Sequence, residues 1–143
     1  MNQTLQLLTE VYANAETAKY LLGKLIKRGD DSDFRHVMAE QYAAYHDIML
    51  SVQRQFANIG QNQPKGCGPI ERAGAHWPMV LHGHIIRKAA HAAELLIHET
   101  VIRLIDVCRA IRACPDAGED AAELAHRLRI TEENHLRQML RYV

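Results

Sequence analysis

The chain lacks the features that mark several large classes of protein. No uninterrupted apolar run approaches the roughly 18 residues that a membrane-spanning helix requires. The opening stretch MNQTLQLLTEVY has no basic cluster followed by an apolar run, which argues against a secretory signal. Lys plus Arg and Asp plus Glu are equal at 17 each, so no net field attracts nucleic acid or an anionic membrane. We therefore expect a cytoplasmic protein that binds neither nucleic acid nor membranes.

Cysteine and the common catalytic motifs are also scarce. Cys67, Cys108 and Cys114 form no Cys-x-x-Cys pair, and an odd number leaves one thiol over if two bridge. Free thiols in a reducing compartment fit this pattern better than a disulfide framework does. The chain contains no Gly-x-Ser-x-Gly elbow, phosphate loop or dinucleotide-binding fingerprint. No catalytic residue stands out, which favours a protein that is not an enzyme.

Helical periodicity, in contrast, runs through most of the chain, while strand signals are few. Segments 5–28 and 32–59 carry apolar stripes that end at Gly29 and Gly60, and Ser32 or Asp33 is predicted to cap the second. The break GQNQPKGCGP precedes a segment, 70–90, that we interpret as a crossover containing a short helix. Segments 91–114 and 121–143 then form two further helices around the turn PDAGED.

Four long helices with short first and last turns and a long middle connection define an antiparallel bundle with one crossover. That connectivity is the ferritin-like one. We predict an all-α, ferritin-like antiparallel four-helix bundle over residues 1–143, as a single domain, with the extra short helix in the crossover between helices 2 and 3. The structural alternative is a two-helix hairpin that completes its core only by dimerising.

The last helix contains a spacing that metal-binding bundles use. Glu132 and His135 are three residues apart, so they stack on one helical face, and Glu-x-x-His is half of the metal site in ferritin-like di-iron bundles. At about 100° per residue, both lie within about 40° of the centre of the apolar stripe. A buried carboxylate must be paired, protonated or bound to a cation. Both residues are therefore predicted to lie in the core.

A complete di-iron site needs a second Glu-x-x-His on helix 2 and one Glu on each of helices 1 and 3. Helix 2 presents Gln41 at its stripe centre, followed by Ala44 and Tyr45, and a neutral amide removes a charge that two iron ions require. Helix 1 offers Glu16, about 100° off its stripe centre, and helix 3 offers Glu94, about 60 to 80° off. Helix 2 thus lacks the expected ligands.

Two interpretations of the core remain. In the favoured one, no cofactor is bound and four residues form a buried polar layer that fixes the helix register: Gln41, Tyr45, Glu132 and His135. In the alternative, iron or zinc is held by four residues: Glu132, His135, Glu94 and Glu16.

Histidines gather in the segment 76–98, which holds five of the nine in the chain. These are His76, His82, His84, His91 and His98. His84, His91 and His98 are spaced by seven residues. Residues seven apart on a helix are separated by about 10.5 Å, which is too far for them to chelate one ion together. The simplest interpretation is a solvated polar face, with a pH-sensitive contact or an assembly-mediated zinc site as alternatives.

Helix 3 is apolar over more than half of its circumference. Its apolar residues that lie well round from Glu94 include Ile85, Leu96, Leu104, Val107 and Ile111. So wide an apolar arc has more than one partner surface to cover. The crossover segment with Trp77, Val80 and Leu81 is one candidate cover, and a second subunit is the other. We expect a homodimer.

Four segments resemble the helices of small, uncharacterised bacterial ferritin-like bundle proteins: NAETAKYLLGKLI, EQYAAYHDI, HAAELLIHETVIRLIDV and LAHRLRITEENHLRQMLRY. The resemblance covers nearly the whole chain, including the loop NIGQNQPKG. It implies recurrent acidic positions at Glu16, Glu40, Glu94, Glu132 and Glu133. The chain departs from that pattern at His98, Glu99 and His135, so the histidine of the Glu-x-x-His spacing is not implied by the family. The resemblance implies a fold and no particular activity.

Together these observations predict a ferritin-like bundle without a di-iron centre, with a structural, stress-related or partner-binding role. The alternative is a metal-binding protein or a degenerate di-iron oxidase that uses Glu132 and His135 with Glu94 and Glu16.

Overall fold

The computed structural model describes residues 2–62, 64 and 88–143. Within these ranges the chain forms four helices and no strand: α1 (Gln3–Ile26), α2 (Ser32–Asn58), α5 (Ala89–Ala113) and α6 (Glu119–Leu140). The helices pack against one another, so the predicted all-α fold is confirmed. None of the helices in the described ranges is both long enough and apolar enough to cross a membrane.

Several predictions from the sequence fall outside the described residues. They concern the short crossover helix, the thiol of Cys67 and the first part of the histidine-rich segment. The residues are Cys67, His76, Trp77, Val80, Leu81, His82, His84 and Ile85.

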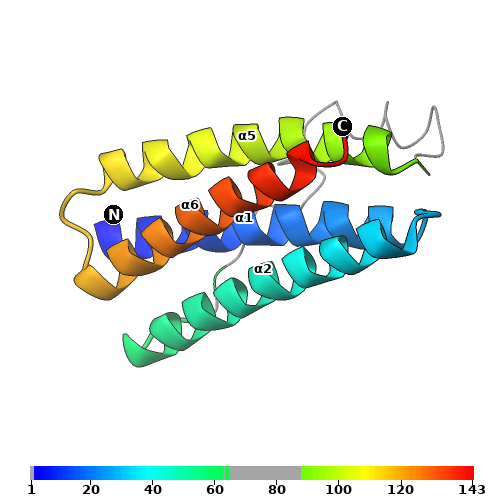
Figure 1. The fold of residues 1–143 in the computed structure, drawn as a ribbon. Coiled ribbons are helices and arrows are strands. Elements are labelled where there is room, and N and C mark those ends of the chain that lie inside the picture. The colour runs from blue at the N-terminus through cyan, green and yellow to red at the C-terminus, as the bar shows by residue number, and fades with distance from the viewer. Residues whose placement is uncertain (1, 63, 65–87) are drawn as a thin grey trace.

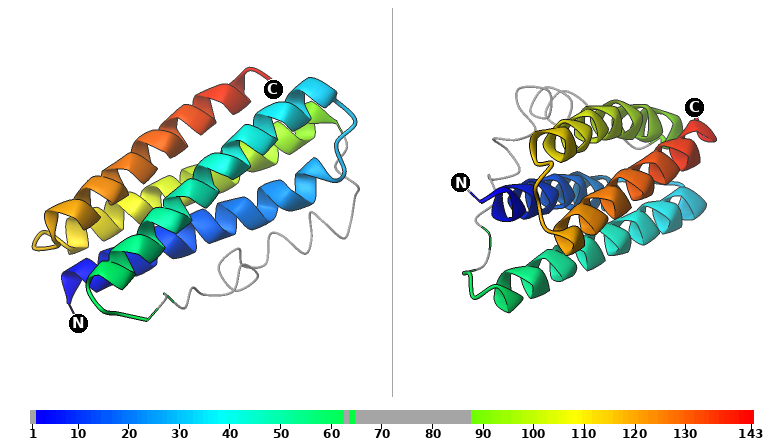
Figure 2. Two further views of the ribbon diagram at one scale, coloured as in Figure 1. Left: turned by 90° about the horizontal axis from the view of Figure 1, so that it is seen from below. Right: turned by 90° about the vertical axis from the view of Figure 1, so that its left-hand side faces the viewer.

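The helices lie side by side along one long axis as two hairpins, α1–α2 and α5–α6 (Figure 1). α1 contacts all three other helices, and α2 also contacts α6. The α1–α2 turn and the C-terminus lie at one end of the bundle, and the α5–α6 turn lies at the other (Figure 1). α2 and α5 run in the same direction at opposite corners, so one side of α5 faces α1 and α6 while the other faces outward (Figure 2).

Side chains and one glycine set the helix ends. The carboxylate of Asp31 accepts a hydrogen bond from the Phe34 N–H at 2.9 Å and caps α2, so the prediction of Ser32 or Asp33 as the cap was wrong. The cap lies one residue earlier because Ser32 already has helical geometry. At the other end, Gly60 has φ +71°, a left-handed conformation that glycine adopts at little cost and that ends the helix, as predicted.

The core is built from the predicted apolar stripes. On α1 the stripe residues Leu8, Val11, Ala15, Leu22 and Leu25 are fully buried. Stripe residues of α2 and α6 are buried with them: Phe34, Met38, Ile48, Val52, Phe56, Ala121, Leu124, Ala125, Leu128 and Met139. Together they form one continuous hydrophobic cluster, which provides the main driving force for folding.

α5 is the exception to this simple pattern. Its inward side buries small and polar residues, including Thr100 and Arg103. Its outward side exposes Val101, Ile102 and Ile105, which are 38%, 47% and 46% exposed. Of the residues expected to form the wide apolar arc of this helix, Leu96 and Val107 are buried and Leu104 and Ile111 pack against the core.

Candidate functional site

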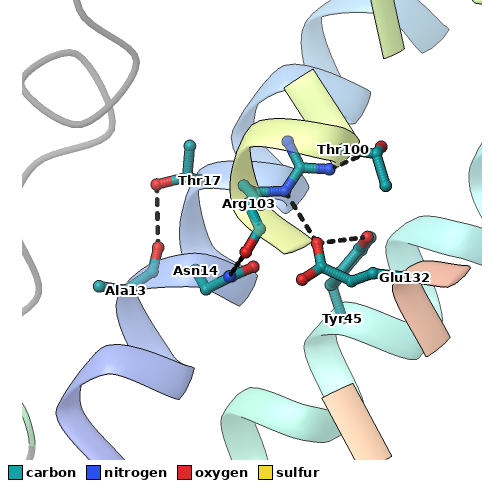
Figure 3. A network of polar contacts seen from close by, with 7 residues as sticks. All are labelled: Ala13, Asn14, Thr17, Tyr45, Thr100, Arg103 and Glu132. Atoms are coloured by element: carbon teal, nitrogen blue, oxygen red, sulfur yellow. Dashed lines mark hydrogen bonds and ion pairs between the residues drawn. The ribbon is translucent and has the colours of Figure 1, made fainter. Parts of the chain in front are cut away.

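Polar side chains from all four helices meet inside the otherwise apolar core. The four residues predicted to form a polar layer, Gln41, Tyr45, Glu132 and His135, are all buried. Five further polar residues are buried in the described helices: Asn14, Thr17, Glu99, Thr100 and Arg103. Figure 3 shows the centre of this group, where side chains of the four helices converge. We refer to these nine residues as the polar layer.

The centre of the polar layer is an ion pair between α5 and α6. The Nε–H of Arg103 donates a hydrogen bond to Oε2 of Glu132 over 3.1 Å, and the two side chains are 5% and 0% exposed (Figure 3). A charge-assisted hydrogen bond is strong in a low-dielectric interior, whereas either charge alone is costly to bury. The pair therefore holds α5 and α6 in one relative register.

The neighbours of this ion pair tie it to the remaining helices (Figure 3). The hydroxyl of Tyr45 on α2 donates to the same Glu132 oxygen over 3.3 Å. Nη2 of Arg103 donates to the Thr100 hydroxyl over 3.1 Å. The main-chain carbonyl of Arg103 accepts a hydrogen bond of 2.9 Å from the Asn14 amide on α1. One arginine thus links four helices through direct and single-residue contacts.

The ionisation of the pair is governed by burial and by its partners. Burial raises the pKa of Glu132 above its ordinary value, and the charge and hydrogen bonds from Arg103, Tyr45 and Asn14 offset this effect only in part. Burial by itself lowers the pKa of Arg103, but Tyr45 and Glu132 raise it above the ordinary value. Arg103 is therefore the group that makes a carboxylate tolerable at this depth, and it stays charged.

Tyr45 and His135 lie against each other, and Tyr45 also lies against Arg103. Their rings make an edge-to-face contact with centroids 5.0 Å apart. The Arg103 guanidinium carbon lies 5.7 Å from the Tyr45 ring centroid. Burial, reinforced by the positive charge of Arg103, lowers the pKa of His135 to about 4. His135 is therefore neutral at physiological pH, and burial also raises the pKa of Tyr45.

Gln41 belongs to the same face of α2 but has a different partner. Its side-chain amide donates to Oε1 of Gln138 on α6 over 2.8 Å. This contact joins α2 to α6 one turn from the Tyr45 contact. The amide therefore serves helix packing, and it brings no negative charge to the layer.

The polar layer is closed to solvent. Glu132, Tyr45 and Arg103 are only 0%, 1% and 4% exposed. A general acid or base must come within hydrogen-bonding distance of its substrate, either directly or through one water. Side chains buried to this degree do not meet a ligand arriving from solution. In this structure the chemistry of the layer consists of internal ion pairing and hydrogen bonding.

The four candidate metal ligands from the sequence are placed in three different environments. Glu132 and His135 lie on the buried face of α6. Glu94 is exposed on α5. Glu16 is partly buried and lines a groove of about 600 Å³ between α1 and α2. In the described ranges, no group of three or more His, Cys, Asp or Glu side chains is arranged to hold one metal ion.

Arg103 is the central residue that the sequence reasoning missed. An arginine among apolar residues on a helix is usually solvated, so no inward role was predicted for it. The sequence did contain a signal for this inward position. One row of residues, spaced three and four apart, forms the buried side of the helix. These positions are Leu96, Thr100, Arg103, Val107, Ala110 and Cys114. Arg103 is the only cation in this row and the only one facing inward on the described part of α5. It is therefore the partner that the buried Glu132 requires.

Comparison of the chain with protein-family models, curated proteins and solved structures finds no significant match. The class that the fold and the polar layer define is an all-α four-helix bundle with an internal, four-helix polar network.

Proposed function

We propose that the chain is a non-enzymatic, partner-binding bundle of ferritin-like architecture whose core is fixed by an ion pair and not by a metal. The observation that carries this proposal is the Arg103–Glu132 contact of 3.1 Å. In di-iron bundles the inward carboxylates of the four helices neutralise metal ions. In this chain the guanidinium of Arg103 supplies the positive charge that Glu132 needs.

The charge balance of the layer supports this proposal. Arginine stays protonated under all physiological conditions, so its charge is permanent. A divalent cation beside it meets repulsion in a low-dielectric interior. α2 supplies no carboxylate to outweigh that repulsion, because Gln41 faces the core there, and Glu94 is exposed. Glu99 is the one carboxylate besides Glu132 among the nine residues of the polar layer.

A partner-binding role is supported by the outer surface of the bundle. Val101, Ile102 and Ile105 lie close together on the outward side of α5 and are each more than a third exposed. Single exposed apolar residues are common on protein surfaces, but a contiguous apolar patch marks an interaction site. The closed interior and the apolar exterior of α5 together favour a function carried by binding.

The metal content of the protein tests this proposal. Untagged protein is purified from cells supplied with iron and zinc, and elemental analysis is applied to the wild type and to Glu132→Gln, which keeps the size of the side chain. We expect substoichiometric metal that is the same in both proteins. Stoichiometric metal in the wild type that is lost in Glu132→Gln would contradict the proposal. Glu40→Gln, an exposed position on α2, is the matched control.

A metal-binding protein, or a degenerate di-iron oxidase, is the second candidate function. It is favoured by two buried atoms, Oε1 of Glu132 and Nδ1 of His135, which have no hydrogen-bond partner among the described residues. Both atoms have lone pairs of the kind that bind iron or zinc. Recruiting Glu94 and Glu16 to the same ion requires both to turn toward the core. The elemental analysis described above decides between the two candidates.

A further inference from the structure

A regular row of exposed residues follows the outward side of α5. Its members are spaced alternately by four and three, and every one is exposed: Glu94, His98, Val101, Ile105, Cys108 and Arg112. We call them the outer row. This is the spacing of a and d positions in a coiled coil, which keeps one seam of a helix turned toward a partner helix.

α5 therefore carries two seams on opposite sides. The inner seam, which includes Leu96, Arg103 and Val107, packs into the bundle against α1 and α6. The outer row has apolar residues at its centre and charged residues at its ends. α5 lies at one corner of the bundle, so one of its sides faces away from the other three described helices (Figures 1 and 2), and the exposure of the outer row places it on that side. A helix with a second seam of this kind is suited to packing against another helix.

The outer row is complementary to itself when reversed. Glu94 and Arg112 lie equally far from position 103 on either side, as do His98 and Cys108, and Val101 and Ile105. Two copies of α5 placed antiparallel about a two-fold axis at this position bring unlike charges together at both ends. They also bring Val101 of each copy against Ile105 of the other. A parallel arrangement places Glu94 on Glu94 and Arg112 on Arg112, which is repulsive.

We propose that two copies of the chain associate through the outer rows of α5 in this antiparallel register. The inference rests on the proposed partner-binding role, because it names the partner as a second copy of the chain. Self-complementarity about a two-fold axis is the property that an isologous dimer interface requires. The central Val101 and Ile105 supply the buried apolar area, and Glu94 and Arg112 determine orientation and register.

Charge reversal tests the register. Sedimentation equilibrium over a wide concentration series gives the dissociation constant of the wild type, of Glu94→Arg, of Arg112→Glu and of the double variant. Each single reversal replaces two attractive pairs by two repulsive ones, so we expect the dimer to weaken about tenfold. The double variant restores both pairs, so its dissociation constant should return to within about threefold of the wild type. Circular dichroism confirms that each variant is folded.

A second readout follows Cys108. In the proposed dimer Cys108 lies against His98 of the partner subunit, so its alkylation by iodoacetamide should slow as protein concentration rises. Peptide-level mass spectrometry isolates this thiol from the buried Cys114. Glu40→Arg, an exposed reversal on α2, is the matched control and should change neither the dissociation constant nor the alkylation rate.

Three outcomes would overturn the inference. The first is a wild-type chain that stays monomeric at every concentration. The second is a dimer that tolerates both single reversals, and the third is a double variant that remains as weak as the singles. Metal content reports on the core and sedimentation reports on the outer row. Failure of this inference is therefore distinguishable from failure of the proposed metal-free core.

Discussion

At the middle of α5, the two sides of the helix reverse the usual distribution of polar and apolar residues. The inward side buries Arg103 and Thr100 at the middle of the helix, while the outward side exposes Val101 and Ile105 at the same level. The difference shows that the inward side of a helix need not be its most apolar side. α6 buries Glu132, and the neighbouring helix must supply a cation at that depth. The apolar residues that remain on the outside then need a partner of their own.

Removing the inner cation should have the largest effect on stability. In Arg103→Met, Glu132 is left buried without its charge partner, and we expect the free energy of unfolding to fall by about 3–5 kcal/mol. Urea denaturation at neutral pH measures this loss. Arg109→Met, an exposed arginine on the same helix, should change the unfolding free energy by less than about 0.5 kcal/mol. Equal losses in the two variants would show that Arg103 is not the residue that stabilises the layer.

A second prediction concerns acid. The pKa of His135 is lowered to about 4 in the folded chain, while an unfolded histidine titrates near 6.5. Acid therefore favours the unfolded state: the stability from neutral His135 is complete above about pH 6.5 and is lost as the pH falls toward 4. His135→Phe keeps the ring contact with Tyr45 and removes the titration.

The measurement compares urea unfolding of the wild type and His135→Phe at pH 7.5 and pH 5. Between these values the wild type should lose about 2 kcal/mol more than the variant. His46→Phe, an exposed histidine on α2, is the control and should follow the wild type. Identical pH profiles for the wild type and His135→Phe would mean that His135 is not held neutral by burial beside Arg103.

A smaller effect is expected where one hydrogen bond of the layer is removed. Tyr45→Phe deletes the 3.3 Å hydrogen bond to Glu132 but leaves the Arg103 contact and the aromatic packing in place. We expect a loss of about 1 kcal/mol in thermal or urea unfolding. Tyr42→Phe, at a partly buried position on the same helix, provides the comparison. A loss as large as that of Arg103→Met would indicate that the tyrosine hydroxyl is as important to the layer as the arginine.

The smallest effect on the fold should come from the outer side of α5. Ile105 is 46% exposed, so Ile105→Lys should change the unfolding free energy of the monomer by less than about 0.5 kcal/mol. The same substitution places two lysines within the proposed dimer seam and should abolish association. Unfolding at low protein concentration and sedimentation at high concentration separate the two quantities. A large loss of monomer stability would mean that Ile105 packs within its own chain.

The helices and the buried face of α6 were predictable from the sequence because they depend on local periodicity. Leu8, Val11 and Leu22 follow the 3.6-residue repeat on α1, and the same repeat placed Glu132 and His135 among the buried residues of α6. Gly60 ends α2 because few other residues adopt its positive φ without strain. In these cases the deciding interaction lies within a few residues of the position itself.

The partners of the buried residues were not predictable in the same way. The Arg103–Glu132 contact joins residues on different helices, and periodicity on one helix does not show which residue of its neighbour faces it. The hydrogen bond from the Asn14 amide to the Arg103 carbonyl also joins two helices, so it was unpredictable for the same reason.

The most direct test of the central claim is a double-mutant cycle on Arg103 and Glu132. The unfolding free energies of the wild type, Arg103→Met, Glu132→Leu and the double variant are measured by urea denaturation at neutral pH. A buried ion pair predicts that the double variant is more stable than Arg103→Met, with a coupling energy of about 3 kcal/mol. Additive losses, with the double variant the least stable of the four, would show that the two charges do not stabilise each other and would contradict the account.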